Sequence, residues 1–142
     1  MTFTTASAEE TIELGAMIAK RLKAGDIVAL SGGLGAGKTT LVKGIAKGLG
    51  VKNYRYVNSP SFVLVKEYKG KVPLFHFDIY RLNNLKDIEE IGYEDYLARK
   101  GVVVIEWSEK MSRILPKGRL DIALKIKGAN ERVISIGETR HA

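Results

Sequence analysis

A glycine-rich segment in the first third of the chain has the residue types and spacing needed to hold phosphate groups. Residues 32–39 match the pattern G-x-x-x-x-G-K-[ST], with Gly32, Gly37, Lys38 and Thr39 at the fixed positions. Glycines let the backbone curl so that consecutive N–H groups point at one anion, and a following helix adds its positive N-terminal end. The lysine of this pattern reaches the β- and γ-phosphates, and the next hydroxyl binds Mg²⁺. The segment therefore predicts a nucleoside triphosphate site with Mg²⁺.

The residues on either side of this segment support that interpretation. Residues 26–31 form a short apolar run, typical of a strand that is buried on both faces of a sheet. Residues 39–48 place apolar side chains on one helical face. A flexible turn that matched the pattern by chance would not need a strand before it and a helix after it.

A glutamate at the end of a second apolar run is the expected partner of this loop. Phosphate-binding loops need a carboxylate at the end of a neighbouring strand, which holds Mg²⁺ directly or through water. Val102–Ile105 is the clearest buried strand in the sequence, and Glu106 follows it. Its alternative interpretation is a solvated strand-end acid. Trp107 also has two interpretations, a core residue or an exposed contact surface.

A third cluster of polar residues lies on a predicted strand and reads His76-Phe77-Asp78-Ile79-Tyr80-Arg81. Along a strand, His76, Asp78 and Tyr80 project to one face, and the apolar residues between them project to the other. Beside a nucleotide such a face would orient water, with Asp78 as the general base. The same residues fit a structural network in which Asp78 pairs with Arg81, and the sequence does not separate the two.

The other segments predict a single α/β domain over residues 1–142, a P-loop NTPase of three layers. Its central sheet is expected to be mostly parallel, with antiparallel additions. A capping box at Ser7–Glu10 begins the first helix, which Gly25 closes. Further elements are expected as strands at 61–68 and 72–80, short helices beginning at Asn83 or Asn84 and at Tyr93, and a C-terminal β-hairpin at about 119–137.

Composition limits the chemistry and the location. The chain has 142 residues and no cysteine, which excludes disulfides, thiolate nucleophiles and cysteine metal sites. The N-terminus lacks the basic start and apolar core of a signal peptide, and no apolar run is long enough to span a membrane, so we expect a cytoplasmic protein. The net charge of +7 fits either a solvated lysine-rich surface or a polyanion partner such as RNA.

Four segments together resemble the TsaE family (formerly YjeE), the small bacterial ATPases of tRNA threonylcarbamoyladenosine synthesis. They occur in the family's order, and with the first helix the resemblance covers Ser7 to Trp107. The segments are Leu34-Gly35-Ala36-Gly37-Lys38-Thr39-Thr40, Asn58-Ser59-Pro60-Ser61, His76-Phe77-Asp78-Ile79-Tyr80-Arg81 and Val104-Ile105-Glu106-Trp107. The phosphate loop alone would not separate this family from other NTPases, whereas the HxDxYR and Glu-Trp segments together do.

The resemblance implies ATP and Mg²⁺ as cofactors, and TsaB and TsaD as protein partners. In this family the ATP cycle is needed for repeated turnover by the TsaB–TsaD complex, which with TsaC makes the modified adenosine beside the tRNA anticodon. Residues 34–40 would bind the phosphates, and Lys38, Asp78 and Glu106 would form the catalytic set. Thr39 and Glu106 would hold the metal. Transfer RNA would be met through the complex, and the sequence does not decide whether the chain also touches it directly.

Two residues depart from the family's pattern. Gly33 stands where many relatives have aspartate, which should loosen the entry of the loop without removing a phosphate donor. Ser61, in the segment that resembles the family's switch-like loop, stands where threonine is usual, so it keeps a hydroxyl but has a freer rotamer.

Three other functions are alternatives to this expectation. A small-molecule kinase would need an acceptor pocket and an arginine-bearing lid, for which the suitable basic residues are Lys110, Arg113, Lys117 and Arg119. A regulatory GTPase would carry D-x-x-G and N-K-x-D motifs, and the sequence contains neither. An RNA-binding module with a structural nucleotide would tolerate the loss of Asp78 or Glu106.

Overall fold

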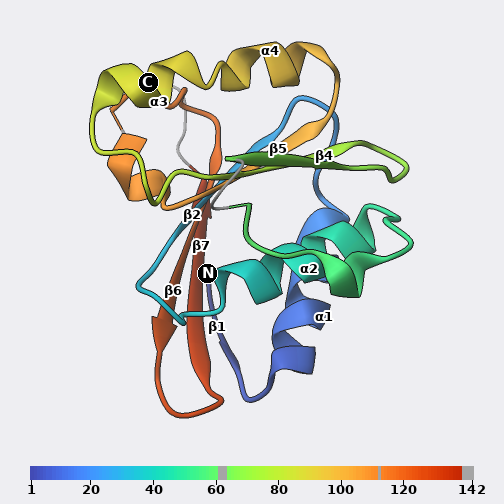
Figure 1. Ribbon diagram of the computed structural model, residues 1–142. Helices are drawn as coiled ribbons and strands as arrows, with labels where there is room; N and C mark the ends of the chain where they lie inside the picture. The colour runs from blue at the N-terminus through green and yellow to red at the C-terminus, as the bar shows by residue number, and fades with distance from the viewer. Residues whose placement is uncertain (61–63, 112, 139–142) are drawn as a thin grey trace.

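A mixed β-sheet lies at the centre of the computed structural model, which describes residues 1–60, 64–111 and 113–138 (Figure 1). The strands are β1 (Thr2–Thr5), β2 (Ile27–Ser31), β3 (Val65–Tyr68), β4 (Leu74–Asp78), β5 (Val102–Glu106), β6 (Leu120–Ile126) and β7 (Arg132–Glu138). Their order across the sheet is β1-β7-β6-β2-β5-β4-β3. Strands β6, β2, β5 and β4 are parallel, whereas β3, β7 and β1 are added antiparallel. The predicted α/β architecture is confirmed.

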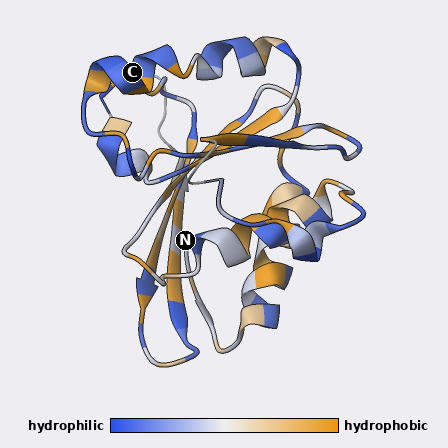
Figure 2. Ribbon diagram, in the orientation of Figure 1, coloured by the Kyte–Doolittle hydropathy of each residue, from blue (hydrophilic) through white to orange (hydrophobic). Residues whose placement is uncertain are grey.

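Helices cover the two faces of the sheet as separate layers. Helices α1 (Ala8–Ala19) and α2 (Lys38–Gly48) pack on one face, and α3 (Leu85–Glu90) and α4 (Tyr93–Ala98) lie on the other (Figure 1). Successive residues of one strand pack against different helix layers. Val104 packs toward α1 and α2, whereas Ile105 belongs to the hydrophobic cluster on the side of α3 and α4. Figure 2 shows that β4 and β5 are largely hydrophobic, as expected for strands covered on both sides.

The packing of α1 against α2 depends on two glycines at their crossing. A Cβ atom on Gly44 would lie 2.1 Å from the carbonyl oxygen of Ile12, and one on Gly15 would lie 2.5 Å from that of Leu41. The two backbones therefore approach closely, which no larger residue permits. Because α2 begins at Lys38, this contact also fixes the helix that carries the end of the phosphate-binding segment.

The caps predicted for the helices are present, with one change of partner. The Ser7 hydroxyl accepts a hydrogen bond from the Glu10 N–H (3.1 Å), but the Glu10 carboxylate returns to the N–H of Ala6 and not to that of Ser7. Asn84, rather than Asn83, caps α3 by accepting from the Asp87 N–H at 2.9 Å. Helix α1 ends at Ala19, before the predicted Gly25.

Two strands differ from the prediction. Strand β1 was not expected, because its threonine-rich sequence has no clear period and it pairs with β7 from the far end of the chain. Strand β4 ends at Asp78 instead of Tyr80, because the Asp78 carboxylate accepts from the Tyr80 N–H at 2.9 Å and turns the chain out of the sheet. Tyr80 therefore does not share a strand face with His76 and Asp78. Of the first predicted strand, residues 61–63 lie outside the described residues.

Among the described residues, none of the helices has both the length and the apolar character needed to cross a membrane.

Replacement of Gly44 by alanine should destabilise the fold. The added methyl group meets the Ile12 backbone at 2.1 Å, and backbone cannot move aside as a flexible side chain can. Overpacking of this kind costs about 1–3 kcal/mol and here outweighs the helix propensity that alanine adds. Urea unfolding measures the change. Gly137→Ala is the matched control, since a Cβ there meets nothing within 4 Å; equal stability of the two variants would contradict the close approach of α1 and α2.

Candidate functional site

The phosphate-binding segment is a tight loop between β2 and α2, and glycines are needed at both of its ends. Gly32 has φ 146°, and a Cβ there would lie 2.6 Å from the Leu124 carbonyl oxygen. Gly37, which immediately precedes α2, has φ 97°. Both conformations are in the region that favours glycine. The loop thus has the strand–loop–helix arrangement that the sequence predicted.

The residues predicted to bind phosphate follow the loop around the start of α2. Leu34 is exposed at the tip, whereas Ala36 is buried. The Gly35 carbonyl accepts a hydrogen bond from Arg132 at 3.1 Å. Lys38 and Thr39 lie in the first turn of α2, and Thr40 follows them.

The Lys38 side chain lies back along the loop, with its ammonium group bonded to the chain itself. Nζ donates to the carbonyl oxygens of Gly32 (2.5 Å) and Gly33 (2.9 Å) and lies 3.8 Å from the centre of the Trp107 ring. Burial lowers the pKa of the Lys38 ammonium, and the carboxylates of Glu106, Glu109 and Asp78 oppose that shift. An anionic phosphate would likewise favour the charged form.

Glu106 lies at the carboxyl end of β5, beside the phosphate-binding loop. Its two carboxylate oxygens each lie 3.2 Å from the Thr39 hydroxyl oxygen, so the hydroxyl faces both of them. The carboxylate also contacts Nε2 of His76, and both side chains are buried. The structure therefore brings the two predicted metal ligands together from elements 67 positions apart in the chain.

The donor set formed by Thr39 and Glu106 fits Mg²⁺. This ion prefers oxygen ligands, and in nucleotide sites it uses one or two protein oxygens together with phosphate and water. Thr39 and Glu106 supply a hydroxyl and a carboxylate that face each other. Across residues 1–60, 64–111 and 113–138 there is no group of three or more histidine, aspartate or glutamate side chains that would hold a metal by itself. The site therefore fits a metal ion whose other ligands would come from a nucleotide and from water.

Asp78 lies next to Glu106, because the two are paired in the register of the parallel strands β4 and β5. One of its carboxylate oxygens accepts from the Tyr80 N–H, and the other accepts from the Ser59 hydroxyl. Asp78 thus connects the sheet to the segment that precedes β3. The predicted switch-like loop is described only as far as Pro60, and its Ser61 lies outside the described residues.

A lysine on α2 holds the same segment from the other side. Lys43 Nζ donates to the carbonyl oxygens of Arg55 and Val57, each at 2.6 Å. Lys43 lies one helical turn after Thr39, so the helix that begins at the phosphate loop also supports the chain leading to Ser59.

Trp107 is a contact of Lys38 rather than a simple core residue. It is half-buried and has φ 66°, an uncommon conformation for a bulky side chain. Its ring packs against the Tyr80 ring with centroids 4.8 Å apart. Neither of the two sequence-based interpretations of Trp107 included this contact.

Two further residues at the site were not identified from the sequence, and His76 was named without Glu106 as its partner. Arg132 reaches the loop from β7, and Glu109 accepts from the Gly32 N–H at 3.3 Å. The register of two neighbouring strands would have pointed to His76, whereas Arg132 and Glu109 carry no local signal, because only the tertiary structure brings them to the loop.

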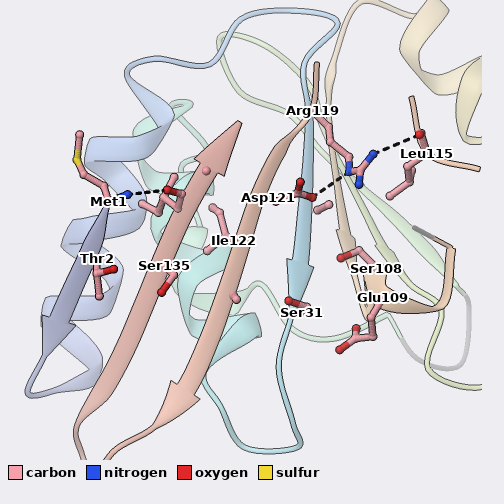
Figure 3. Close-up of a pocket in the computed structure, with 14 residues that line it drawn as sticks. Met1, Thr2, Ser31, Ser108, Glu109, Leu115, Arg119, Asp121, Ile122 and Ser135 are labelled. Atoms are coloured by element: carbon pink, nitrogen blue, oxygen red, sulfur yellow. Dashed lines mark hydrogen bonds and ion pairs between the residues drawn. The ribbon is translucent and has the colours of Figure 1, made fainter. Parts of the chain in front are cut away.

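A separate groove of about 430 Å³ lies on the sheet face opposite α1 and α2 (Figure 3). Small residues of β2, β6 and β7 form its floor, including Ser31 and Ser135, and Ser108 and Glu109 lie at its wall. Arg119 points across it to Asp121, which it contacts at 2.9 Å. Of the predicted site residues, none lines this groove.

Comparison with known proteins identifies the family. A profile described as "Threonylcarbamoyl adenosine biosynthesis protein TsaE" matches residues 5–134. A Bacillus subtilis protein named tRNA threonylcarbamoyladenosine biosynthesis protein TsaE is 42% identical over 132 residues, which cover 92% of this chain and 81% of that protein. A Treponema pallidum protein of the same name is 38% identical over 130 residues, covering 92% of this chain and 95% of that protein.

The fold agrees with that assignment. A crystal structure of Bacillus subtilis YdiB superposes with a TM-score of 0.78 at 35% sequence identity, covering 98% of this chain and 85% of that one. The profile match spans the phosphate loop, Asp78 and Glu106, the residues that the structure brings together. The chain therefore belongs to the TsaE family and has its P-loop NTPase fold.

Proposed function

We propose that this chain binds ATP with Mg²⁺ and hydrolyses it, and that the ATP cycle supports turnover of a TsaB–TsaD complex in threonylcarbamoyladenosine modification of tRNA. The names of the relatives support the role in threonylcarbamoyladenosine synthesis, and the geometry of the site supports the binding and hydrolysis of ATP. Transfer RNA is reached through the complex, and the cytoplasm, where tRNA is modified, is the place of action.

The observation that best supports hydrolysis is the position of the Thr39 hydroxyl, which faces the Glu106 carboxylate. A phosphate loop by itself only holds an anion. A buried carboxylate that faces the hydroxyl after the loop lysine adds the oxygen ligands that Mg²⁺ needs beside a triphosphate. Thr39 and Glu106 would hold Mg²⁺ there, and the ion would supply positive charge to the phosphates during transfer of the γ-phosphoryl group to water, with ADP as the leaving group.

Lys38 supplies the cation for the phosphates. Its ammonium now bonds two neutral carbonyl groups, and a phosphate oxygen is a stronger acceptor because it is charged. We propose that Lys38 exchanges these carbonyls for the nucleotide. The loop's backbone N–H groups and the N-terminal end of α2 hold the same anion.

Asp78 and Ser59 serve the hydrolytic step. Asp78 is placed beside Glu106 by strand register and holds the Ser59 hydroxyl with one carboxylate oxygen. We assign Asp78 to the orientation of the attacking water and of the Ser59 segment. The hydrogen bonds from the Ser59 hydroxyl and the Tyr80 N–H to Asp78 would then serve both to hold the site together and to orient the groups that act in hydrolysis.

The kinase alternative has less support from the structure. Arg119 donates to Asp121 and to the carbonyls of Leu115 and Pro116, and Lys110 donates to the carbonyls of Tyr80 and Leu82. Two of the basic residues considered for a lid are therefore engaged within the chain. The RNA-binding alternative assigns no role to the alignment of Thr39 with Glu106.

Reconstitution tests the proposal as a whole. Phosphate release is measured for the chain alone and with TsaB and TsaD, and modified tRNA is counted over several turnovers with TsaC present. We expect slow hydrolysis by the chain alone and multiple turnovers only with the intact site. Phosphate transfer to a metabolite would favour a kinase, and tight tRNA binding without nucleotide would favour an RNA-binding module.

Replacement of Lys38 by alanine should weaken ATP binding by at least about tenfold, because a charge-assisted hydrogen bond to phosphate contributes roughly 1.5–3 kcal/mol. Calorimetric titration with a non-hydrolysable ATP analogue measures the change. Lys47→Ala is the matched control on the same helix, since Lys47 lies in the last turn of α2, where it forms an exposed ion pair with Glu13 and a distant ring contact with Tyr54. Full modification activity of the Lys38→Ala protein would sink the ATPase proposal.

Replacement of Asp78 by asparagine should slow hydrolysis more than it weakens binding. Asparagine preserves the size of the side chain but removes the charge that would orient the attacking water, so we expect kcat to fall by about 10²-fold or more. The affinity for the ATP analogue should change less than about threefold. An equal loss in both quantities would instead indicate that Asp78 only holds the fold of the site.

A further inference from the structure

His76 lies deep in the sheet, at a position where a polar side chain needs a reason. It is in the middle of β4, paired with Val104 of β5 and Lys66 of β3, and it is 0% exposed. Its side chain is on the face opposite Phe75 and Phe77, which belong to the apolar cluster under α3 and α4. His76 therefore occupies a core position on the side of the phosphate loop.

The imidazole has one polar contact among the described residues, and that contact is Glu106. Nε2 faces the Glu106 carboxylate, whereas Nδ1 is buried and has no hydrogen-bond partner in the described part of the chain. A carboxylate oxygen accepts hydrogen bonds, so the tautomer with hydrogen on Nε2 is the one that donates to Glu106. A buried polar atom without a hydrogen-bond partner costs folding free energy. Because Nδ1 lacks a partner among the described residues, the contact of Nε2 with Glu106 is the feature that explains a histidine at this position.

The bond from His76 restricts how Glu106 can turn. Glu106 has a flexible side chain that, without a partner at its back, could rotate away from the loop. With Nε2 fixed on one side and the Thr39 hydroxyl 3.2 Å from each carboxylate oxygen on the other, the carboxylate is aimed at the start of α2. The result is a chain of contacts from the sheet interior through Glu106 to Thr39.

We propose that His76 is a positioning residue that aims the Glu106 carboxylate at the metal beside the nucleotide. The inference rests on the proposed function, because it needs Glu106 to be a magnesium ligand. His76 does not touch nucleotide or metal itself. It acts as the outer partner of a ligating carboxylate, a class of residue whose loss typically weakens metal binding about 10–100-fold.

The experiment measures the magnesium dependence of nucleotide binding, which needs no turnover. A non-hydrolysable ATP analogue is titrated calorimetrically in EDTA and at increasing Mg²⁺, and the Mg²⁺ concentration for half of the affinity gain is recorded. The variants are His76→Leu, which fills the space without a donor, and His76→Gln, whose amide can donate from nearly the place of Nε2. Glu106→Gln reports on the proposed metal ligand, and Tyr93→Phe is a control that removes a partly buried hydrogen bond to the Ile114 carbonyl on the other face of the sheet.

We expect His76→Leu to need about 10–100-fold more Mg²⁺ for half of the gain, with affinity in EDTA unchanged. His76→Gln should recover most of that loss, and Tyr93→Phe should match the parent chain. A parent-like magnesium dependence in His76→Leu would overturn the proposal, as would a His76→Gln variant no better than His76→Leu at equal thermal stability.

Failure of the proposed function gives a different pattern. In that case the parent chain gains no affinity from Mg²⁺, or Glu106→Gln keeps the gain, whatever the His76 variants do. If His76→Leu does not fold, His76→Ala, which leaves room for water beside Glu106, replaces it in the same comparison with His76→Gln.

Discussion

The burial of the Glu106 carboxylate beside the phosphate-binding loop is the constraint on which the rest of the site depends. A carboxylate that is 2% exposed needs partners, and it finds them in the Thr39 hydroxyl and the His76 ring. Together with Glu106 itself, these groups come from three different elements, α2, β4 and β5. The sheet register and the position of α2 must therefore both be correct before the carboxylate is satisfied, so the fold and the proposed metal site are stabilised together.

The close crossing of α1 and α2 fixes the position of α2, which the Thr39–Glu106 contact requires. Gly15 and Gly44 let the helix backbones approach, and α2 then holds the phosphate loop at its N-terminal end and Lys43 one turn later. Lys43 in turn supports the chain that leads to Ser59 and Asp78. One helix thus connects the phosphate-binding loop with the segment proposed to act in hydrolysis, through contiguous packed contacts.

Lys38 and Trp107 form a second set of contacts at the loop. The Lys38 ammonium is shared between backbone carbonyls and an indole ring, so its positive charge is partly compensated by the chain itself. Trp107 adopts a positive φ at the end of β5 and directly follows Glu106. The proposed metal ligand Glu106 and the residue whose ring contacts Lys38 are therefore placed by the same turn of the chain.

Sequence patterns by themselves pointed to the phosphate loop, to Asp78 within a polar cluster on a strand, to Glu106 after a buried strand, and to the α/β order of elements, because spacing along one strand or helix is a local property. They did not determine β1, whose pairing with β7 is long-range, or the end of β4, where an Asp78 side-chain bond overrides strand propensity. Nor did they reveal the partner of Glu106 or the approach of Arg132 to Gly35. Those contacts join residues 30 and 97 positions apart, and only packing of the whole chain decides which distant side chains meet.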